Sequence, residues 1–271
     1  TYKNCLIMKK WIKRLAVLML SAAVLVVLVT ALQKEQKLNL SEPIIELDIQ
    51  DGMALLTEVE LIERLKFVRL YYPEMKVEEL DIQAIEQFVL DMNEVEEAQV
   101  YKLIGNTWNI RAKIRRPIAR IIPGGRDGFY MDNRGRLMAL TSSYHARVLT
   151  FTGLDEFNTE EVLVADVINN DSLITNTKLG EIYRISNYVC NSAFYNSQIV
   201  QVHYLPSEGY VFLPRVGNHE IIFGRAPSPE DVEAKFEKLT TFYDEVIPFE
   251  GWDTYSSINL KFEKQIVAKK K

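Results

Sequence analysis

The sequence is poor in the residues from which metal sites and disulfide frameworks are built. It contains two cysteines, Cys5 and Cys190, and three histidines among 271 residues. The cysteines fall on opposite sides of a long apolar run, so a membrane would keep them apart and we expect no disulfide between them. His145, His203 and His219 show no His-x-x-x-His spacing and have no cysteine neighbour, so we expect each at a surface or loop position. We therefore predict no bound metal and no cofactor.

An excess of basic charge is also lacking. The formal net charge is -5 and the isoelectric point is near 5.5, so no positive field would attract phosphates, and nucleic acid is excluded as a partner. Apolar residues make up 48% and charged residues 25%, which is ordinary for a folded protein. The length allows one large domain or two modest ones.

Catalytic motifs are sparse as well. Ser142 and Ser143 precede His145 without the Gly-x-Ser-x-Gly elbow of hydrolases, and the glycine-rich run 124–128 lacks the Gly-Lys-Ser/Thr ending of a phosphate loop. Adjacent carboxylates occur at 78–79 and 96–97, but neighbouring side chains on a helix or strand point apart. The sequence therefore favours a protein that is not an enzyme.

A long hydrophobic run does occur near the N-terminus. Leu15 to Leu32 contains no charged residue and is long enough to cross a bilayer as a helix. Basic residues cluster before this run, whereas only Lys34 and Lys37, offset by Glu35, follow it; the preceding ones are Lys9, Lys10, Lys13 and Arg14. By the positive-inside rule we expect residues 1–14 in the cytoplasm, a transmembrane helix at 15–32, a linker at 33–42 and the remainder exported to the other side of the membrane.

A cleavable signal peptide is the alternative for this run, because 29–31 resembles a small-x-small cleavage site. The run is longer than the usual signal core of about 7–15 residues, which favours a retained anchor. Met8 resembles a typical start, so we assign Thr1 to Ile7 no role.

The first stretch after the linker, residues 43–117, has a mixed pattern. A short alternating strand at 44–49 is followed by a helix capped by Thr57, whose expected apolar face is Val59, Ile62, Leu65 and Phe67. Asp81 caps a second helix, and two long strands follow at 95–104 and 108–118. The order β-α-α-β-β predicts helices covering one face of a sheet.

The second stretch, residues 118–267, is rich in strands. We expect a hairpin at 129–132 and 137–140, helices at 159–168 and after the Ser228 cap, and a short basic tail at 268–271. The other expected strands are 147–152, 181–185, 199–205, 209–213, 221–223 and 256–267. The fold class is therefore α+β, with one transmembrane helix, a β-α-α-β-β domain and a strand-rich β domain that ends in a helix and a final strand.

This organisation resembles the FtsQ/DivIB family of bacterial cell-division proteins. The likeness rests on the order of basic tail, single span, β-α-α-β-β module and β domain, and on the hairpin that begins Phe129-Tyr130-Met131-Asp132 and contains Gly135. The run 143–153 is similar to the form found in Bacteroidetes-type members. The resemblance implies that the first module is a POTRA domain, that the span lies in the inner membrane and that the exported residues fold in the periplasm.

The resemblance also implies a non-enzymatic divisome scaffold that binds FtsB- and FtsL-type single-pass proteins and contacts the septal peptidoglycan synthesis machinery. Two other functions remain open: a membrane-anchored periplasmic hydrolase acting on the cell wall, and a POTRA-bearing envelope assembly factor. Tandem POTRA modules or a transmembrane β-barrel would favour the latter, and neither is visible in the sequence.

The C-terminal strand is the expected binding site. Ile258, Leu260, Phe262 and Ile266 alternate with polar residues, and a final strand is expected at a sheet edge, where a partner strand can pair with it. The family uses this region for FtsB-type partners, and on this chain the matching candidates are Trp252, Thr254, Tyr255, Ser257, Asn259, Lys261 and Glu263. The alternative is that these residues complete the core and that the edge remains charged against aggregation.

Overall fold

The structure, a computed structural model, describes residues 2–124, 128–140, 144–154 and 178–271. The helix expected at 159–168, most of the glycine-rich run and the two serines at 142 and 143 lie outside these residues. The chain divides into two compact units, which we describe separately. Unit 1 comprises residues 1–48 and 57–113, and unit 2 comprises residues 49–56 and 114–271.

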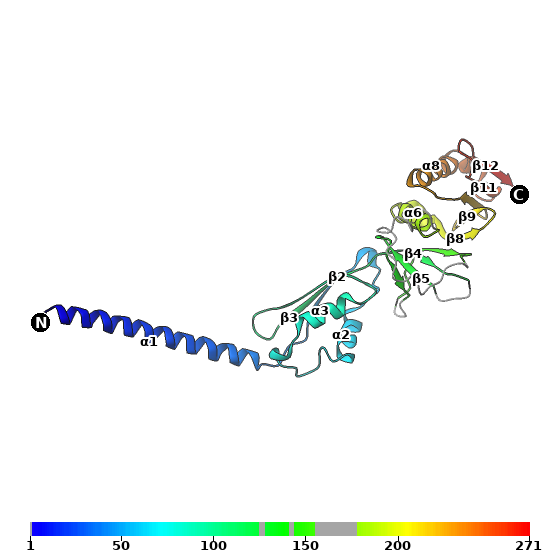
Figure 1. Ribbon diagram of the computed structural model, residues 1–271. Coiled ribbons are helices and arrows are strands. Elements are labelled where there is room, and N and C mark those ends of the chain that lie inside the picture. Colours follow the sequence, from blue (N-terminus) through cyan, green and yellow to red (C-terminus); the bar gives the residue numbers. More distant parts are fainter. Residues whose placement is uncertain (1, 125–127, 141–143, 155–177) are drawn as a thin grey trace. The chain divides into compact units, whose positions relative to one another are not determined.

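Unit 1 begins with helix α1, Tyr2–Gln36, which is continuous (Figure 1). Within it, Val17–Gln36 is, among the described residues, the one helical segment long and apolar enough to cross a membrane. A helix of this length and composition fits a single-pass membrane anchor. The large apolar side chains described from Val17 to Val29 are exposed, as lipid contact requires.

The rest of unit 1 has the expected element order. Strand β1 (Ile44–Asp48) is followed by α2 (Glu58–Phe67), α3 (Ile82–Leu90), β2 (Val95–Lys102) and β3 (Trp108–Ile114), with the short 3-10 turn η2 (Val77–Glu79) between α2 and α3. The 3-10 turn η1 (Gln50–Gly52), between β1 and α2 in the chain, belongs to unit 2. The sheet order is β1-β3-β2, and β1 runs parallel to β3. The side chain of Thr57 accepts a hydrogen bond from Glu60 N, and that of Asp81 accepts one from Ala84 N, so both predicted helix caps are confirmed.

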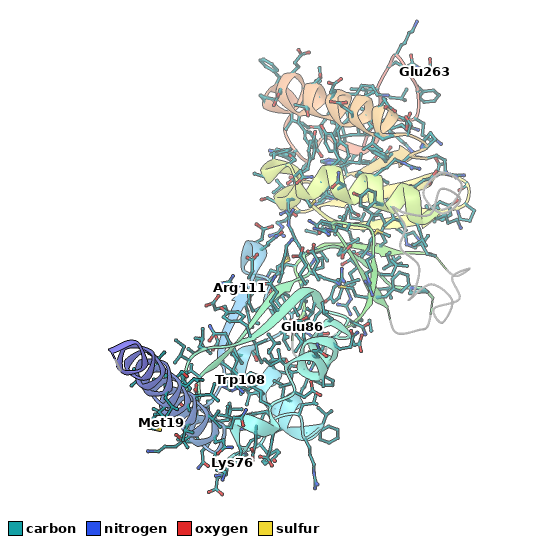
Figure 2. All side chains as sticks on the ribbon, turned by 60° about the vertical axis from the view of Figure 1, so that its left-hand side comes forward. Met19, Lys76, Glu86, Trp108, Arg111 and Glu263 are labelled. Atoms are coloured by element: carbon teal, nitrogen blue, oxygen red, sulfur yellow. The ribbon has the colours of Figure 1, made fainter. Side chains whose placement is uncertain are left out.

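The core of unit 1 lies between these helices and β3. Trp108, Ile110 and Ala112 are fully buried, as their alternation predicted, and Figure 2 shows Trp108 within this unit. The expected apolar face of α2 is wrong in part, because Val59 and Phe67 are 72% and 89% exposed. The helix buries Leu65, as expected, together with Leu61, and residues two positions from either lie about 200° around the axis.

The described strands of unit 2 form one mixed sheet in the order β12-β11-β10-β9-β8-β7-β4-β5-β6. Parallel pairs join β4 to β7, β7 to β8 and β10 to β11. The strands are β4 (Pro117–Ile121), β5 (Phe129–Asp132), β6 (Leu137–Ala139), β7 (Leu149–Thr152), β8 (Ile199–Leu205), β9 (Gly209–Pro214), β10 (Glu220–Gly224), β11 (Tyr255–Asn259) and β12 (Val267–Lys270).

Helices pack against this sheet and share one apolar core with it. They are α6 (Lys178–Cys190), α7 (Ala193–Gln198), α8 (Pro229–Glu245) and α9 (Ile247–Glu250). The strand expected at 181–185 is wrong, since these residues lie in α6. The helix buries Leu179, Ile182, Ile185 and Val189, whose spacing of three and four residues marks one helical face.

The final strand expected at 256–267 is also wrong. Strand β11 ends at Asn259, a turn follows, and β12 returns antiparallel to β11. Residues 268–270, expected in a basic tail, belong to β12. The outermost strand on this side of the sheet is therefore β12, and β11 lies between β10 and β12.

Candidate functional site

The C-terminal edge of the sheet is built by β11 and β12. Ser257 of β11 pairs with Glu220 of β10 on one side and with Lys269 of β12 on the other. Strand β12 comes last in the described sheet order. One side of β12 therefore has backbone N–H and C=O groups available for a further strand.

Helices α8 and α9 position this edge. The Ser228 side chain accepts a hydrogen bond from Asp231 N, and Pro229 occupies the first turn, which confirms the predicted start of α8. The core-facing side of α8 includes Phe236 and Leu239, both fully buried. Helix α9 ends at Gly251, whose φ of +84° suits glycine and turns the chain toward β11.

Trp252 is half-buried and packs against the buried aromatic rings of His219 and Tyr243. Its ring stacks on that of His219 at 6.4 Å and lies 5.1 Å from the ring of Tyr243. His219 lies in the loop between β9 and β10, as expected, but it is only 2% exposed, with Nε2 3.1 Å from the Tyr243 hydroxyl, so it is not a surface residue. Burial lowers the pKa of His219, which favours a neutral imidazole in the folded protein.

The other two histidines lie elsewhere in unit 2. His203 is half-buried in β8, with Nδ1 2.9 Å from Thr152 Oγ1, and His145 is exposed.

Tyr255 is also packed inward. It is 8% exposed, and its ring meets that of Phe242 edge-on at 5.3 Å. Lys270 Nζ lies 5.8 Å from the same ring and forms an ion pair with Glu250 at 2.7 Å. The hydrogen bond to Glu250 raises the pKa of Lys270. The Tyr255 side chain therefore packs against α8 in the core and does not project from the edge of the sheet into solvent.

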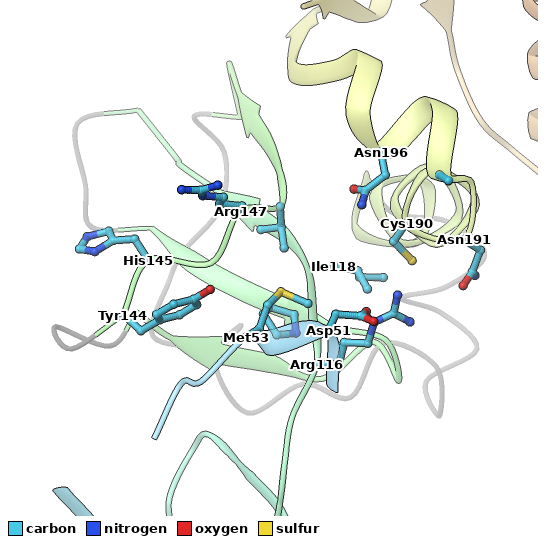
Figure 3. A pocket seen from close by; sticks show the side chains of 13 residues that line it. Asp51, Met53, Arg116, Ile118, Tyr144, His145, Arg147, Cys190, Asn191 and Asn196 are labelled. Atoms are coloured by element: carbon cyan, nitrogen blue, oxygen red, sulfur yellow. The ribbon is translucent and has the colours of Figure 1, made fainter. Parts of the chain in front are cut away.

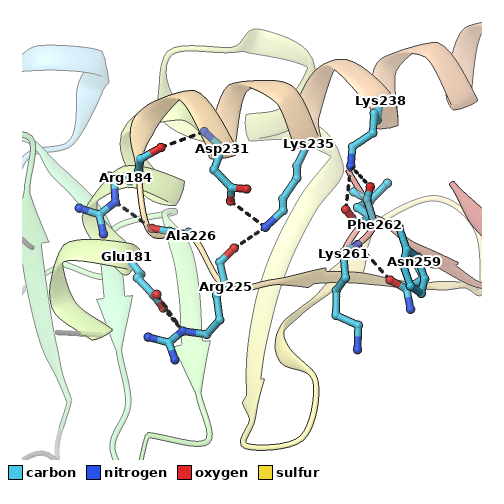
Figure 4. Close-up of polar contacts among 12 residues, drawn as sticks. Glu181, Arg184, Arg225, Ala226, Asp231, Lys235, Lys238, Asn259, Lys261 and Phe262 are labelled. Atoms are coloured by element: carbon cyan, nitrogen blue, oxygen red, sulfur yellow. Dashed lines mark hydrogen bonds and ion pairs between the residues drawn. The ribbon is translucent and has the colours of Figure 1, made fainter. Parts of the chain in front are cut away.

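The turn between β11 and β12 is held by α8. Lys238 Nζ donates hydrogen bonds to Leu260 O at 2.8 Å and Phe262 O at 2.7 Å (Figure 4). Asn259 Oδ1 accepts a hydrogen bond from Lys261 N at 3.0 Å, and Lys261 also pairs with Glu208. Phe262, expected in the core, is 45% exposed because the chain has already left the sheet at this point.

The remaining predicted residues occupy different environments. Thr254 donates a hydrogen bond to Glu250 O, Ser257 is half-buried in β11, and Glu263 is exposed in the turn. The structure thus brings the predicted set to one end of the sheet, but it divides the set between core and turn. The residues that sequence reasoning missed are those of β12 and Lys238. The apolar and small residues 266–268 were the available signal for β12, although a continuous alternating pattern concealed the turn before it.

Unit 2 also contains a hollow of about 780 Å³ beside α6. Figure 3 shows Cys190 and His145 on opposite sides of it, so they form no nucleophile and base pair there. Burial raises the pKa of the Cys190 thiol, which favours the less reactive protonated form. Arg116 lines the same hollow and pairs with Asp51 at 2.6 Å.

The carboxylate pairs considered for acid-base chemistry have structural partners. Glu96 forms an ion pair with Lys113 at 3.1 Å, and Glu79 accepts a hydrogen bond from Lys76 N at 2.6 Å. These contacts give both side chains a structural role in unit 1, with the Glu96 side chain only 7% exposed and Glu79 exposed.

Comparison with known proteins identifies the part of the chain that contains the candidate edge. A family model described as FtsQ/DivIB, C-terminal related, matches residues 116–269. The match begins just before β4 and ends within β12, so it covers the sheet of unit 2. No curated protein matches the chain.

Proposed function

The chain belongs to the FtsQ/DivIB family, whose role is in cell division, and from this premise we propose that it is a non-enzymatic scaffold of the divisome. Its proposed partners are FtsB- and FtsL-type single-pass proteins, with further contacts to the septal peptidoglycan synthesis machinery. The N-terminal helix would hold it in the inner membrane with its folded units in the periplasm, the first of them acting as a POTRA domain. The observation that carries this proposal is the open edge of β12.

An open strand edge supports binding through the backbone of a partner. A partner strand would hydrogen-bond to β12, and its side chains would find the exposed Val267 and the lysines at 269–271 within reach. Lys270 and Lys271 already form ion pairs with Glu250 and Asp253, so it is Lys269 that favours a partner strand with acidic residues, and electrostatic attraction would speed its association. Lysines also discourage unwanted pairing between sheet edges, so charge restricts the choice of partner.

The structure revises the set of residues proposed to touch the partner. Lys261 and Glu263 are exposed in the turn and remain candidates, as do the half-buried Thr254, Ser257 and Asn259 in or beside β11. Trp252 and Tyr255 support the edge through the core. Substituting either would alter the fold as well as binding, so neither gives a clean test.

Substitutions in β12 give a cleaner one. Proline at Ala268 removes a backbone N–H, and Lys269→Glu reverses charge on the same strand; both should reduce capture of the FtsB-type partner in a pulldown with the full chain in detergent. The matched controls are Lys264→Pro and Lys264→Glu, because Lys264 is exposed in the preceding turn and outside the strand. Normal capture by both β12 variants would refute the proposed edge.

The cellular role has a separate test. In the bacterium, a fluorescent fusion should gather at the septum, and depletion of the protein should block division and leave cells joined or elongated. Uniform fluorescence around the envelope together with normal division on depletion would refute the divisome assignment itself, whatever the outcome at β12.

A further inference from the structure

In unit 1, the tip of the β2–β3 hairpin is tied to the end of helix α1. Gly105 N, at the tip, donates a hydrogen bond to Glu35 Oε1 at 2.7 Å, which joins residues 70 positions apart. Asn106 Nδ2 donates to Asn39 O at 2.9 Å, and Ser41 N donates to Asn106 O at 2.9 Å. These bonds fix the tip beside the point where the apolar helix ends.

The tip presents apolar side chains to its surroundings. Ile104 is 98% exposed and Leu103 is 44% exposed, and Leu38, next to Asn39 in the segment bonded to the tip, is 42% exposed. A single exposed leucine on a protein surface needs no explanation, but three apolar side chains gathered at one point form a patch. Ile104 in particular contributes almost nothing to the folding of unit 1.

The position of Glu35 places this patch relative to a bilayer. The uncharged run ends at Leu32, and Glu35 is three residues further along the helix, which corresponds to about 4.5 Å along its axis. The polar headgroup layer on each side of a bilayer is about 5–8 Å thick. With the end of this uncharged run taken as the boundary of the hydrocarbon core, Glu35 and the hairpin tip would fall within the headgroup layer.

Positive side chains surround the same point. Lys76 is exposed and its Nζ donates a hydrogen bond to Asn39 Oδ1 beside the helix end (Figure 2). Lys102, the last residue of β2, is exposed, and its Nζ donates to Val77 O at 3.0 Å. Lys34 in the last turn of α1 and Lys37 just after the helix are both exposed. The carboxylate of Glu35 accepts a hydrogen bond from Gly105 N at the tip, and the carboxylate of Glu79 accepts one from Lys76 N.

We propose that the β2–β3 hairpin tip is a second membrane contact, in which Ile104 and Leu103 insert among the lipid headgroups beside α1. The lysines around the tip would meet lipid phosphates while the apolar side chains reach the boundary of the acyl chains. Unit 1 is then attached to the bilayer at two points, which fixes its tilt and keeps it close to the surface. This contact is independent of the β12 edge and of any division partner.

Depth-dependent fluorescence quenching tests the proposal with the full chain. The native Cys5 and Cys190 are replaced by serine, Ile104→Cys is labelled with an environment-sensitive fluorophore, and the protein is reconstituted into vesicles of phosphatidylethanolamine and phosphatidylglycerol. Nitroxide lipids labelled at the headgroup or the upper acyl chain should strongly reduce the emission of the label. The reference is the emission of the same protein in detergent-free nanodiscs without nitroxide lipids. The emission maximum of the label at position 104 should also lie at shorter wavelength than that of a label exposed to water.

Asp48→Cys is the matched control. Asp48 is exposed in unit 1, and the register of β1 and β3 places it opposite Lys113. Lys113 is at the end of β3 remote from the hairpin tip, about 20 Å from the tip along the strand. Its label should show neither quenching nor a spectral shift. Equal signals at positions 104 and 48, or no quenching at 104, would overturn the proposal. Because Ile104 is fully exposed, its substitution should leave the thermal unfolding of the protein unchanged, and this measurement excludes misfolding as the cause of a negative result.

Discussion

At the scale of single residues, unit 2 depends on one buried ion pair. Arg115 Nη1 lies 3.0 Å from Asp132 Oδ2, and the two side chains are 7% and 1% exposed. Asp132 Oδ1 also accepts hydrogen bonds from Arg134 N at 2.9 Å and Arg136 N at 2.7 Å, which close the turn between β5 and β6. Burial raises the pKa of Asp132, and these contacts oppose that effect. The aspartate of the family-like hairpin thus has a structural role.

Removal of this carboxylate should therefore be costly. We expect Asp132→Ala to lower the free energy of unfolding by about 3–5 kcal/mol, because Arg115 would be left as an unpaired buried charge. Hydrogen exchange of the β4 and β5 amides in the full chain would measure the loss. Glu208→Ala is the control, since its pair with Lys261 is partly exposed and should contribute at most about 1 kcal/mol. Similar protection in the two variants would contradict this role.

His219 gives a second prediction at this scale, which concerns pH. Its pKa is lowered in the folded protein mainly by burial, with Lys271 adding to this and Asp253 and the Trp252 backbone opposing it. The unfolded chain binds a proton near pH 6.5, whereas the folded chain resists it, so stability is lost as the pH falls from about 7 toward the lowered pKa.

The slope from one such group is at most about 1.4 kcal/mol per pH unit. Urea unfolding at several pH values should show a smaller loss for His219→Gln than for the wild type over this window. The same pH dependence in both proteins would show that His219 does not titrate as the structure indicates.

At the scale of elements, Lys238 couples α8 to the turn before β12. Its two hydrogen bonds satisfy the carbonyls of Leu260 and Phe262, and burial lowers its pKa. Residues 260–266, which connect β11 to β12, form neither helix nor strand. In addition to the ladder between β11 and β12, a side chain from the neighbouring helix therefore helps to hold the turn that leads into β12.

We expect Lys238→Met to loosen this turn while α8 remains folded. Two carbonyl groups would lose their donor at a cost of about 1 kcal/mol, because the site is partly open to water. Hydrogen exchange of the amides at 261–266 should accelerate, and partner capture should weaken. Glu237→Met introduces the same side chain at the adjacent exposed position and should do neither. Unchanged exchange in Lys238→Met would show that the turn is held without α8.

The elements that could be predicted from sequence are those specified by local chemistry. The caps at Thr57, Asp81 and Ser228 depend on residues within one turn of the chain, and the alternation from Trp108 onward records a strand with one buried face. These signals need no knowledge of the rest of the fold.

The elements that could not be predicted depend on distant packing. Residues 181–185 suit a short strand, but they lie in a helix because Leu179 and Val189, outside that window, extend the same apolar face. In the candidate site, the alternation of Leu260 and Phe262 predicts a continuous strand, but the chain turns there. The carbonyl groups of this turn accept hydrogen bonds from Lys238 of α8, which is remote in sequence. The burial of Trp252 depends on His219 and Tyr243, which are remote in sequence.

At the scale of the whole molecule, the chain combines a membrane anchor with two folded units of different kinds. Unit 1 is a small sheet with helices, and unit 2 carries the large sheet that matches the family. For a divisome scaffold, both units must lie on the same side of the membrane as the partner domains. The charges that flank the apolar run are expected to determine that side.

The orientation itself is the prediction that tests the whole arrangement. Lys9, Lys10, Lys13 and Arg14 precede the run, whereas Glu35 offsets part of the charge of the lysines at 34 and 37. A reporter fused after Lys37 that works only outside the cytoplasm, such as alkaline phosphatase, should be active, and one that works only in the cytoplasm should not. Neutral substitution of the four preceding basic residues should reduce the phosphatase activity, because it removes the charge difference that holds the N-terminus inside. An active cytoplasmic reporter after Lys37 would place both folded units in the cytoplasm, out of reach of periplasmic partner domains, and the β12 edge would then lack its proposed ligand.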